Sequence, residues 1–278
     1  GRIGWGTSQG QVRFRKVRIE GTVQDRSGPL VDEKAKLPYK IISRGDAAGP
    51  YQAFPDACRL ANGDIIAVFY AGYGHVSLPN DAWPKGGRIC TVRSNDEGRT
   101  WTEPVILYDD DIDNRDPHIA QMSDGTLICS FFSLKPVDRS VSTRGFKSQG
   151  VQIVCSHDGG RTWDMEARTL VPSGWVRSAP VREMPDGTYI LGVYHGHDCG
   201  GVIRSTDKGK TWSDPIPIGK EANLPLDAET DVIPLKDGTL YAALRSSRIN
   251  MHYATSSDLG LTWSPVQDIG FKGHAPHL

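Results

Sequence analysis

The 278-residue chain lacks several features that would place it in other classes of protein. No apolar run approaches the roughly 20 residues of a membrane span, so no membrane-spanning helix is predicted. No long basic run is present and the formal net charge is −1, which makes nucleic acid an unfavourable partner. Apolar residues show no helical period of about 3.6 residues. These absences leave an all-β fold as the class that the sequence favours.

Cysteine is scarce, and its spacing carries no metal or redox motif. The five cysteines stand apart, mostly in apolar runs: Cys58, Cys90, Cys129, Cys155 and Cys199. No Cys-x-x-Cys or His/Cys metal spacing occurs, so we expect buried hydrophobic side chains and predict neither a metal nor a cofactor. The acidic stretch 109–114 lacks the glycine and terminal glutamate of an EF-hand loop. A solvated acidic loop is the expected structure there.

One short motif is written four times, as Ser-x-Asp-x-Gly-x-Thr-Trp. Its copies are "SNDEGRTW" (94–101), "SHDGGRTW" (156–163), "STDKGKTW" (205–212) and "SSDLGLTW" (256–263). A second motif accompanies it, with Asn-Gly or Asp-Gly between two β-rich apolar runs, a strong hairpin signal. Its glycines are Gly63, Gly125, Gly187 and Gly238. Four antiparallel strands in each repeat of about 50–60 residues predict the blades of a β-propeller.

The repeats define the predicted domains. Residues 37–278 hold four full blades, and "GHAPHL" (273–278) looks like the start of a fifth. We therefore expect the chain to be a piece of a longer propeller protein. Residues 1–21 alternate apolar and basic side chains, which indicates terminal strands of an upstream β-sandwich-like domain. Residues 22–36 are polar and aperiodic, which indicates a linker.

The four-fold motif is interpreted as a turn rather than a site, because a catalytic group has no reason to be copied in every repeat. Its Ser and Asp can accept hydrogen bonds from nearby backbone, its Gly allows positive φ, and its Trp can fill space between sheets. These turns and the Asp-Gly turns share one face of the propeller. The long segments 71–87 and 133–150 lie on the other face, where we expect the site.

Charged residues begin the innermost strands, where they are costly unless they serve a cavity. They are Asp56, Arg115, Asp116, His118, Arg177, Glu229, Asp231 and His274. Reflection through the Asp237–Gly238 turn places Glu229 opposite Ser246 and beside Arg245, so a carboxylate and a guanidinium should meet. An ordinary salt bridge is the alternative. Asp81, in the loop with Tyr73 and Trp83, is a candidate general acid, with a solvated loop residue as the alternative.

The repeated motifs resemble the Asp-boxes of sialidases and sialidase-like glycoside hydrolases, over residues 38–278. "ETDVIPLKDGTLYAALRSS" is similar to the family segment with the glutamate that assists a tyrosine nucleophile, followed by a carboxylate-binding arginine. The resemblance implies these roles for Glu229 and Arg245, and the acid/base role for Asp81. It also implies a six-bladed propeller when complete, a retaining mechanism, a glycan substrate and an extracellular or periplasmic location.

The sequence departs from the family at one position. Sialidases open the first blade with Arg-Ile-Pro, where this chain has Ala53, Phe54 and Pro55, followed by Asp56. The arginine that grips a sugar carboxylate is absent, which favours an exo-glycosidase for a different terminal sugar. With a neutral sugar, Asp56 could act directly as a catalytic carboxylate. Arg115, Asp116, Arg177, Asp231 and His274 are expected to bind substrate. A non-catalytic propeller that binds glycans or proteins is the alternative function.

Overall fold

The computed structural model describes residues 40–43, 48–164, 166, 168–171, 174–177, 179–196 and 199–278. The chain divides into two units at Ile41 and Ile42, and the structure below is that of the second unit, Ile42–Leu278. The predicted upstream strands (1–21) and linker (22–36) lie outside the described residues. No helix among the described residues is long and apolar enough to cross a membrane.

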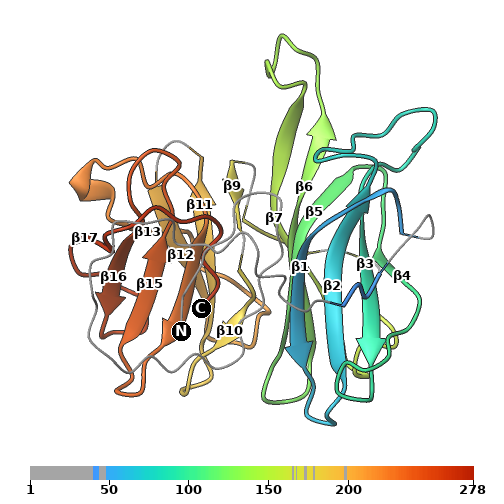
Figure 1. The fold of residues 1–278 in the computed structure, drawn as a ribbon. Coiled ribbons are helices and arrows are strands. Elements are labelled where there is room, and N and C mark those ends of the chain that lie inside the picture. Colours follow the sequence, from blue (N-terminus) through green and yellow to red (C-terminus); the bar gives the residue numbers. More distant parts are fainter. Residues whose placement is uncertain are drawn as a thin grey trace, which may run out of the picture. The chain divides into compact units, whose positions relative to one another are not determined.

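The described strands form four antiparallel sheets that follow one another along the chain (Figure 1). The first sheet contains β1 (Tyr51–Arg59), β2 (Ile65–Gly72), β3 (Arg88–Ser94) and β4 (Val105–Tyr108). The second contains β5 (Asp113–Gln121), β6 (Leu127–Pro136), β7 (Phe146–Ser156) and β8 (Arg168–Val171). The third contains β9 (Trp175–Val176), β10 (Arg182–Glu183), β11 (Tyr189–His195), β12 (Cys199–Ser205) and β13 (Ile216–Ile218). A 3₁₀ helix, η1 (Lys220–Ala222), precedes the fourth, which contains β14 (Thr230–Pro234), β15 (Leu240–Leu244), β16 (His252–Ser256) and β17 (Gln267–Asp268).

This arrangement confirms the predicted all-β propeller with four blades. Each blade has the up-and-down strand order that the repeat indicated, except that the innermost edge of the third is divided between β9 and β10, which both pair with β11. Residues 273–278 pair with no strand among the described residues. Their last residue nevertheless makes the bond to the fourth sheet that Ile119 of β5 makes to the first. Leu278 N donates to Asp231 (2.8 Å), and Ile119 N donates to Asp56 (3.0 Å).

The Asp-Gly turns are three-residue loops. In the fourth sheet Leu235 N donates to Thr239 O (2.7 Å) and Gly238 N donates to Leu235 O (3.0 Å), and Gly238 has a φ of 86°. This is a type I turn closed by a left-handed glycine, one of the common hairpin connections. The symmetry centre is therefore Asp237, and Glu229 lies opposite Arg245 rather than opposite Ser246 as predicted. The sequence "DG" alone does not distinguish two-residue from three-residue loops.

The Asp-box turns are held by bonds within the motif itself, as predicted. In the third sheet Ser205 Oγ donates to Asp207 (2.8 Å), and Gly209 N donates to Ser205 Oγ (2.8 Å). Thr211 donates to the same carboxylate from both N and Oγ1 (2.9 and 2.6 Å). The bond from the Thr211 hydroxyl is the largest of the causes that hold the pKa of Asp207 to about 2. Equivalent bonds hold Asp96, Asp158 and Asp258.

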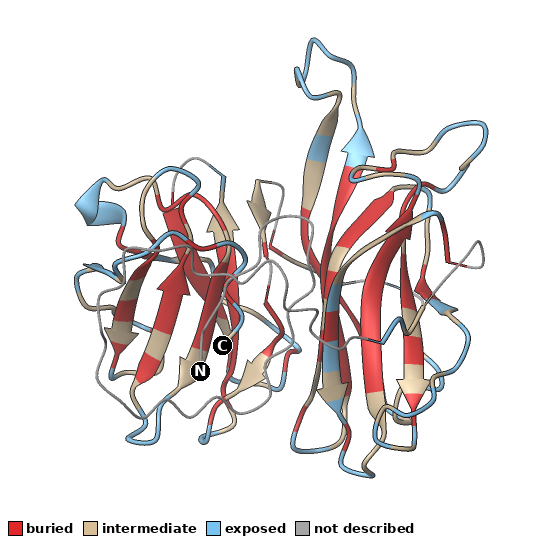
Figure 2. Cartoon of the chain, viewed as in Figure 1, coloured by how far each residue is buried: buried red, intermediate tan, exposed pale blue. Residues whose placement is uncertain are grey.

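The hydrophobic core lies between consecutive sheets, and Figure 2 shows its buried residues along the central strands. Successive residues of one strand serve different neighbours: Leu127 and Cys129 pack toward the first sheet, whereas Ile128 packs toward the third. In the same way Leu191 packs toward the second sheet and Ile190 toward the fourth. The Asp-box tryptophans also pack against these clusters: Trp101, Trp163, Trp212 and Trp263. This two-sided alternation is what stacked blades require.

The two ends of the sheets differ, as the sequence predicts. Figure 1 shows the long β2–β3 and β6–β7 connections at the end opposite the β1–β2 turn. Half of the segment 133–150, predicted as an irregular loop, is strand, because β6 and β7 stay paired from Leu134↔Ser148 to Pro136↔Phe146. A bulge between Phe132 and Leu134 lets the hairpin continue past the rest of the sheet.

Candidate active site

Glu229 and Arg245 meet at the open end of the β14–β15 hairpin, so the predicted pairing is confirmed. Arg245 N donates to Glu229 O (2.9 Å), and Arg245 Nη1 donates to Glu229 Oε1 (2.5 Å) and to Oε2. The Arg245 side chain is 18% exposed and that of Glu229 is 15% exposed, so the ion pair is mostly shielded from solvent but still accessible. Arg245 Nε is buried without a hydrogen-bond partner. The pair therefore combines a fixed carboxylate with a guanidinium that keeps an unused donor.

Arg115 and Asp116 lie in a bulge near the start of β5. The register shifts between Arg115 and His118, and Asp116 has a φ of 49°, which an L residue adopts only under constraint. The Arg115 guanidinium lies 5.4 Å from the Phe54 ring centroid and 5.5 Å from that of Tyr70, within cation–π range. Its Nη2 lies 3.7 Å from Asp116 Oδ1. Arg115 is 5% exposed, so the site holds a largely buried cation bordered by aromatic rings.

The Asp116 carboxyl has unusual acidity for an aspartate. Burial raises its pKa to about 6, the guanidinium groups of Arg115 and Arg177 lower it in part, and the Glu229 charge raises it further. Asp116 and Glu229 therefore influence each other electrostatically although they belong to different sheets. A carboxyl in this state can exchange a proton near neutral pH.

Asp113 anchors the long β2–β3 loop next to Arg115. It accepts bonds from Tyr70 Oη (2.9 Å) and Ser77 N (3.0 Å), and its side chain is fully buried. Burial raises the pKa of Asp113, while Arg115 and these donors lower it in part. Gly87 closes the loop, and a Cβ there would lie 2.1 Å from Asp113 Oδ1. The loop is consequently fixed at both of its ends.

Two of the predicted substrate-binding residues, Arg177 and Asp231, are buried and already paired. Arg177 has no exposed surface and donates to the carbonyls of Asp116, Ser130 and Ala179, so it supports the bulge and does not offer an atom to a ligand. Burial lowers its pKa to about 10, although nearby groups, Asp116 among them, raise it in part. Asp231 is 1% exposed and binds Arg182 Nη2 (2.7 Å). His274 is exposed.

The two other predicted catalytic carboxylates differ in their surroundings. Asp81 is exposed in the Asn80–Trp83 turn, and the Tyr73 and Trp83 rings expected to cover it pack on each other instead (6.0 Å). Asp56 is 8% exposed, and its oxygens accept bonds from Ile119 N (3.0 Å) and Ala57 N (2.8 Å). Burial raises the pKa of Asp56, but His118, His277 and Ile119 N–H outweigh burial and hold it at about 2. Asp56 is a fixed anion, not a mobile acid.

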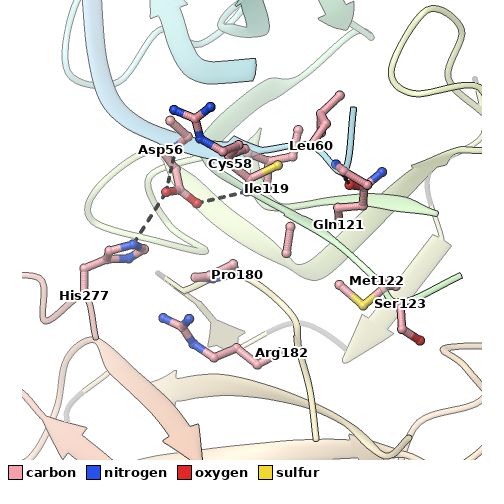
Figure 3. Close-up of a pocket in the computed structure, with 14 residues that line it drawn as sticks. Asp56, Cys58, Leu60, Ile119, Gln121, Met122, Ser123, Pro180, Arg182 and His277 are labelled. Carbon is pink, nitrogen blue, oxygen red and sulfur yellow. Dashed lines mark hydrogen bonds and ion pairs between the residues drawn. The ribbon is translucent and has the colours of Figure 1, made fainter. Parts of the chain in front are cut away.

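A pocket of about 510 Å³ opens beside Asp56, and Figure 3 shows Asp56 and His277, which both line it, pointing toward each other. Gln121, Ser123 and Arg182 also line it. Sequence reasoning missed this pocket, and it named His118 without a role and His277 not at all. The shared Pro-His step of "DPHI" and "APHL" was the available signal.

Comparisons with known proteins agree with the propeller fold. A family model described as "BNR repeat-like domain" matches residues 88–275. A sialidase of Bacteroides fragilis is 27% identical over 90% of this chain and 48% of its own length. A sialidase of Paraclostridium sordellii is 26% identical over 77% of this chain and 57% of its own. The chain thus spans about half the length of the sialidases it matches.

Among solved structures, a Dyadobacter fermentans protein of unknown function superposes with a TM-score of 0.69 at 23% identity, covering 85% of this chain and 73% of that one. The intramolecular trans-sialidase of Ruminococcus gnavus superposes with a TM-score of 0.65 at 16% identity, covering 83% and 73%. At these identities the similarity shows that the chain has the sialidase propeller fold.

Proposed function

Because this chain belongs to the BNR repeat-like domain family, we propose that it is a sialidase-like exo-glycoside hydrolase, which removes a terminal sugar from a glycan. The observation that carries the proposal is the Glu229–Arg245 pair, a shielded carboxylate and guanidinium at the loop-bearing end of a propeller. The sialidase relatives and the sialidase fold support it.

In the proposed retaining reaction, Glu229 accepts the proton of a hydroxyl nucleophile as its oxygen bonds to the anomeric carbon and the glycosidic bond breaks. Glu229 returns that proton in the second step, when water displaces the nucleophile from the anomeric carbon. A carboxylic acid gives its proton to the departing glycosidic oxygen, and in the second step its carboxylate takes a proton from the attacking water. Arg245 holds the Glu229 carboxylate in place for this role. Asp81 remains the proposed acid, and its exposed turn would have to close over the substrate. A retained anomeric configuration in the released sugar, followed by NMR, supports this course, and inversion contradicts it.

The aromatic-bordered Arg115 gives the proposed site its selectivity. Ala53 occupies in β1 the place that Arg115 occupies in β5, because both residues precede the same register shift. The first blade would therefore offer the sugar no arginine at this place, and the second blade would offer Arg115, which borders the Phe54 ring. We propose a substrate with a neutral or weakly acidic terminal sugar, in the extracellular or periplasmic space where such glycans are accessible.

The test is a panel of 4-methylumbelliferyl glycosides, sialoside included, with the wild-type protein and Glu229→Gln. Hydrolysis by the wild type that Glu229→Gln abolishes supports the proposal. Lack of turnover of every sugar by a folded wild-type protein contradicts it.

A non-catalytic glycan-binding propeller is the second candidate, favoured by the absence of an arginine at Ala53 and by the ring-bordered Arg115. Aromatic and guanidinium groups together form a surface on which sugars stack and hydrogen-bond. A glycan array distinguishes the two: binding that Glu229→Gln leaves intact, with no turnover by either protein, indicates the binding module.

A further inference from the structure

Asp56, His118 and His277 bring three ligand-type side chains to one point. Their donor atoms all lie within 4.8 Å of one another. His118 Nδ1 lies 3.1 Å from Asp56 Oδ2, and His277 Nε2 lies 3.6 Å from Asp56 Oδ1. The two imidazole rings are stacked, with centroids 5.9 Å apart. The three residues are far apart in the chain, so no single local motif contains all three.

The separations suit a small divalent ion. Bonds of about 2.0–2.1 Å from zinc to nitrogen and oxygen, in tetrahedral geometry, place neighbouring donors about 3.3 Å apart. The observed 3.1 and 3.6 Å bracket that value. His277 is half exposed, so its ring can turn to complete the geometry, whereas the carboxylate is buried.

The surroundings hold the carboxylate in a ligand's orientation. Ile119 N and Ala57 N donate one bond to each oxygen of Asp56, which fixes its plane, as outer partners of metal-binding carboxylates do. Asp56 and His277 also border the pocket of about 510 Å³, so a fourth coordination position would face open space. Three protein ligands with one open position is the arrangement of zinc sites that act on a bound molecule.

The fourth sheet offers an internal comparison. Asp231 accepts from Val232 N and Leu278 N (both 2.8 Å), which repeats the backbone bonds of Asp56. The side chain that faces Asp231, however, is Arg182 at 2.7 Å, a permanent cation that cannot bind a metal. The same pair of backbone hydrogen bonds thus holds Asp231, which faces an arginine, and Asp56, which faces two imidazoles.

We propose that Asp56, His118 and His277 bind one divalent transition-metal ion of the zinc class, with an open coordination position directed at the pocket. Two histidines and one carboxylate favour zinc, iron(II) or cobalt(II) over magnesium and calcium, which prefer oxygen donors. The ion is independent of the proposed hydrolysis at Glu229, and its test does not use activity.

The experiment is calorimetric titration of zinc chloride into the untagged protein after removal of metals by a chelator. One saturable site is expected in the wild type, with Mg²⁺ and Ca²⁺ binding far more weakly. His277→Ala removes a half-exposed ligand with little expected effect on folding, and should weaken zinc binding at least about tenfold. His274→Ala, an exposed histidine in the same segment, is the matched control and should leave zinc affinity unchanged.

A second measurement uses cobalt(II), whose visible absorption reports nitrogen and oxygen coordination in a tetrahedral site. The absorption should appear at one equivalent in the wild type and be lost in both His277→Ala and Asp56→Asn, with circular dichroism establishing that each variant is folded. Absence of saturable zinc binding by the folded wild type overturns the proposal. Equal zinc affinity in His277→Ala, or Mg²⁺ binding as strong as zinc binding, overturns it too.

Discussion

Asp207 lies in a turn that recurs in each of the four blades, whereas Glu229 lies at a strand start whose sequence changes from blade to blade. The Asp207 carboxylate is satisfied by Ser205 and Thr211 of its own motif. The Glu229 carboxylate is held by Arg245 of the neighbouring strand, and its charge reaches Asp116 in another sheet. A residue that closes its own turn can be copied into any blade. A residue that depends on distant partners works only in one place.

The largest effect expected is on catalysis. Glu229→Gln keeps the shape of the side chain but removes its charge and basicity, and should lower kcat by about 10²–10⁴-fold. Asp207→Asn, the carboxylate of the opposite face, should change kcat less than about twofold under conditions where the protein stays folded. Initial rates at saturating aryl glycoside measure both. A similar loss of kcat in the two folded variants would remove the distinction between the faces.

The variant Arg177→Met tests whether the buried Arg177 guanidinium stabilises the fold. Arg177→Met leaves the carbonyls of Asp116 and Ser130 without their charged donor inside the protein. The free energy of unfolding should fall on the order of 3 kcal/mol. Denaturant titration measures it, with Arg59→Met as the control, because Arg59 pairs with Glu97 in an exposed ion pair and should barely matter. If Arg177→Met left the stability unchanged but weakened glycan binding, Arg177 would be a substrate-binding residue and not a support of the fold.

Gly87 tests how tightly the β2–β3 loop is anchored. Gly87→Ala places a Cβ against Asp113 and Tyr70, the latter at 2.4 Å, and should cost about 1–3 kcal/mol of stability. Gly196→Ala is the control, since no atom of the described residues, apart from its chain neighbours, lies within 4 Å of a Cβ built there. The melting temperatures of Gly87→Ala and Gly196→Ala measure the difference in stability. Equal melting temperatures would mean that the β2–β3 loop shifts freely to accommodate the added methyl group.

The smallest effect expected is a pH dependence of the Asp-box turns. The pKa of Asp207 is about 2 in the folded protein and 3.8 in the reference state, so the native state binds fewer protons there. Its stabilising contribution is present above about pH 4 and is lost as the pH falls from about 4 to 2. Asp207→Asn should melt a few degrees below the wild type at pH 7, with the difference closing at pH 2. A difference that stays constant across this range contradicts the assignment.

The sequence predicted what is local and missed what is distant. Four Asp-boxes and four Asp-Gly turns gave the number of blades and the scaffold face correctly, because their bonds close within a few residues. The Glu229–Arg245 pair was found with an error of one residue, since a hairpin joins near neighbours. The burial of Arg177 and the meeting of Asp56 with His277 depend on how separate blades pack, which no local pattern encodes.

The alternation of Leu127, Ile128 and Cys129 between two cores also limits how the chain can change in length. Insertion of one residue in such a strand would exchange two interfaces at once, and both would lose their fit. Tolerated insertions and deletions are thereby directed to the connections between strands. The β2–β3 connection (73–87) is longer than the Asp-box connection of the same sheet (95–104), which is consistent with this limit. New specificities can accumulate there while the blades beneath keep their register.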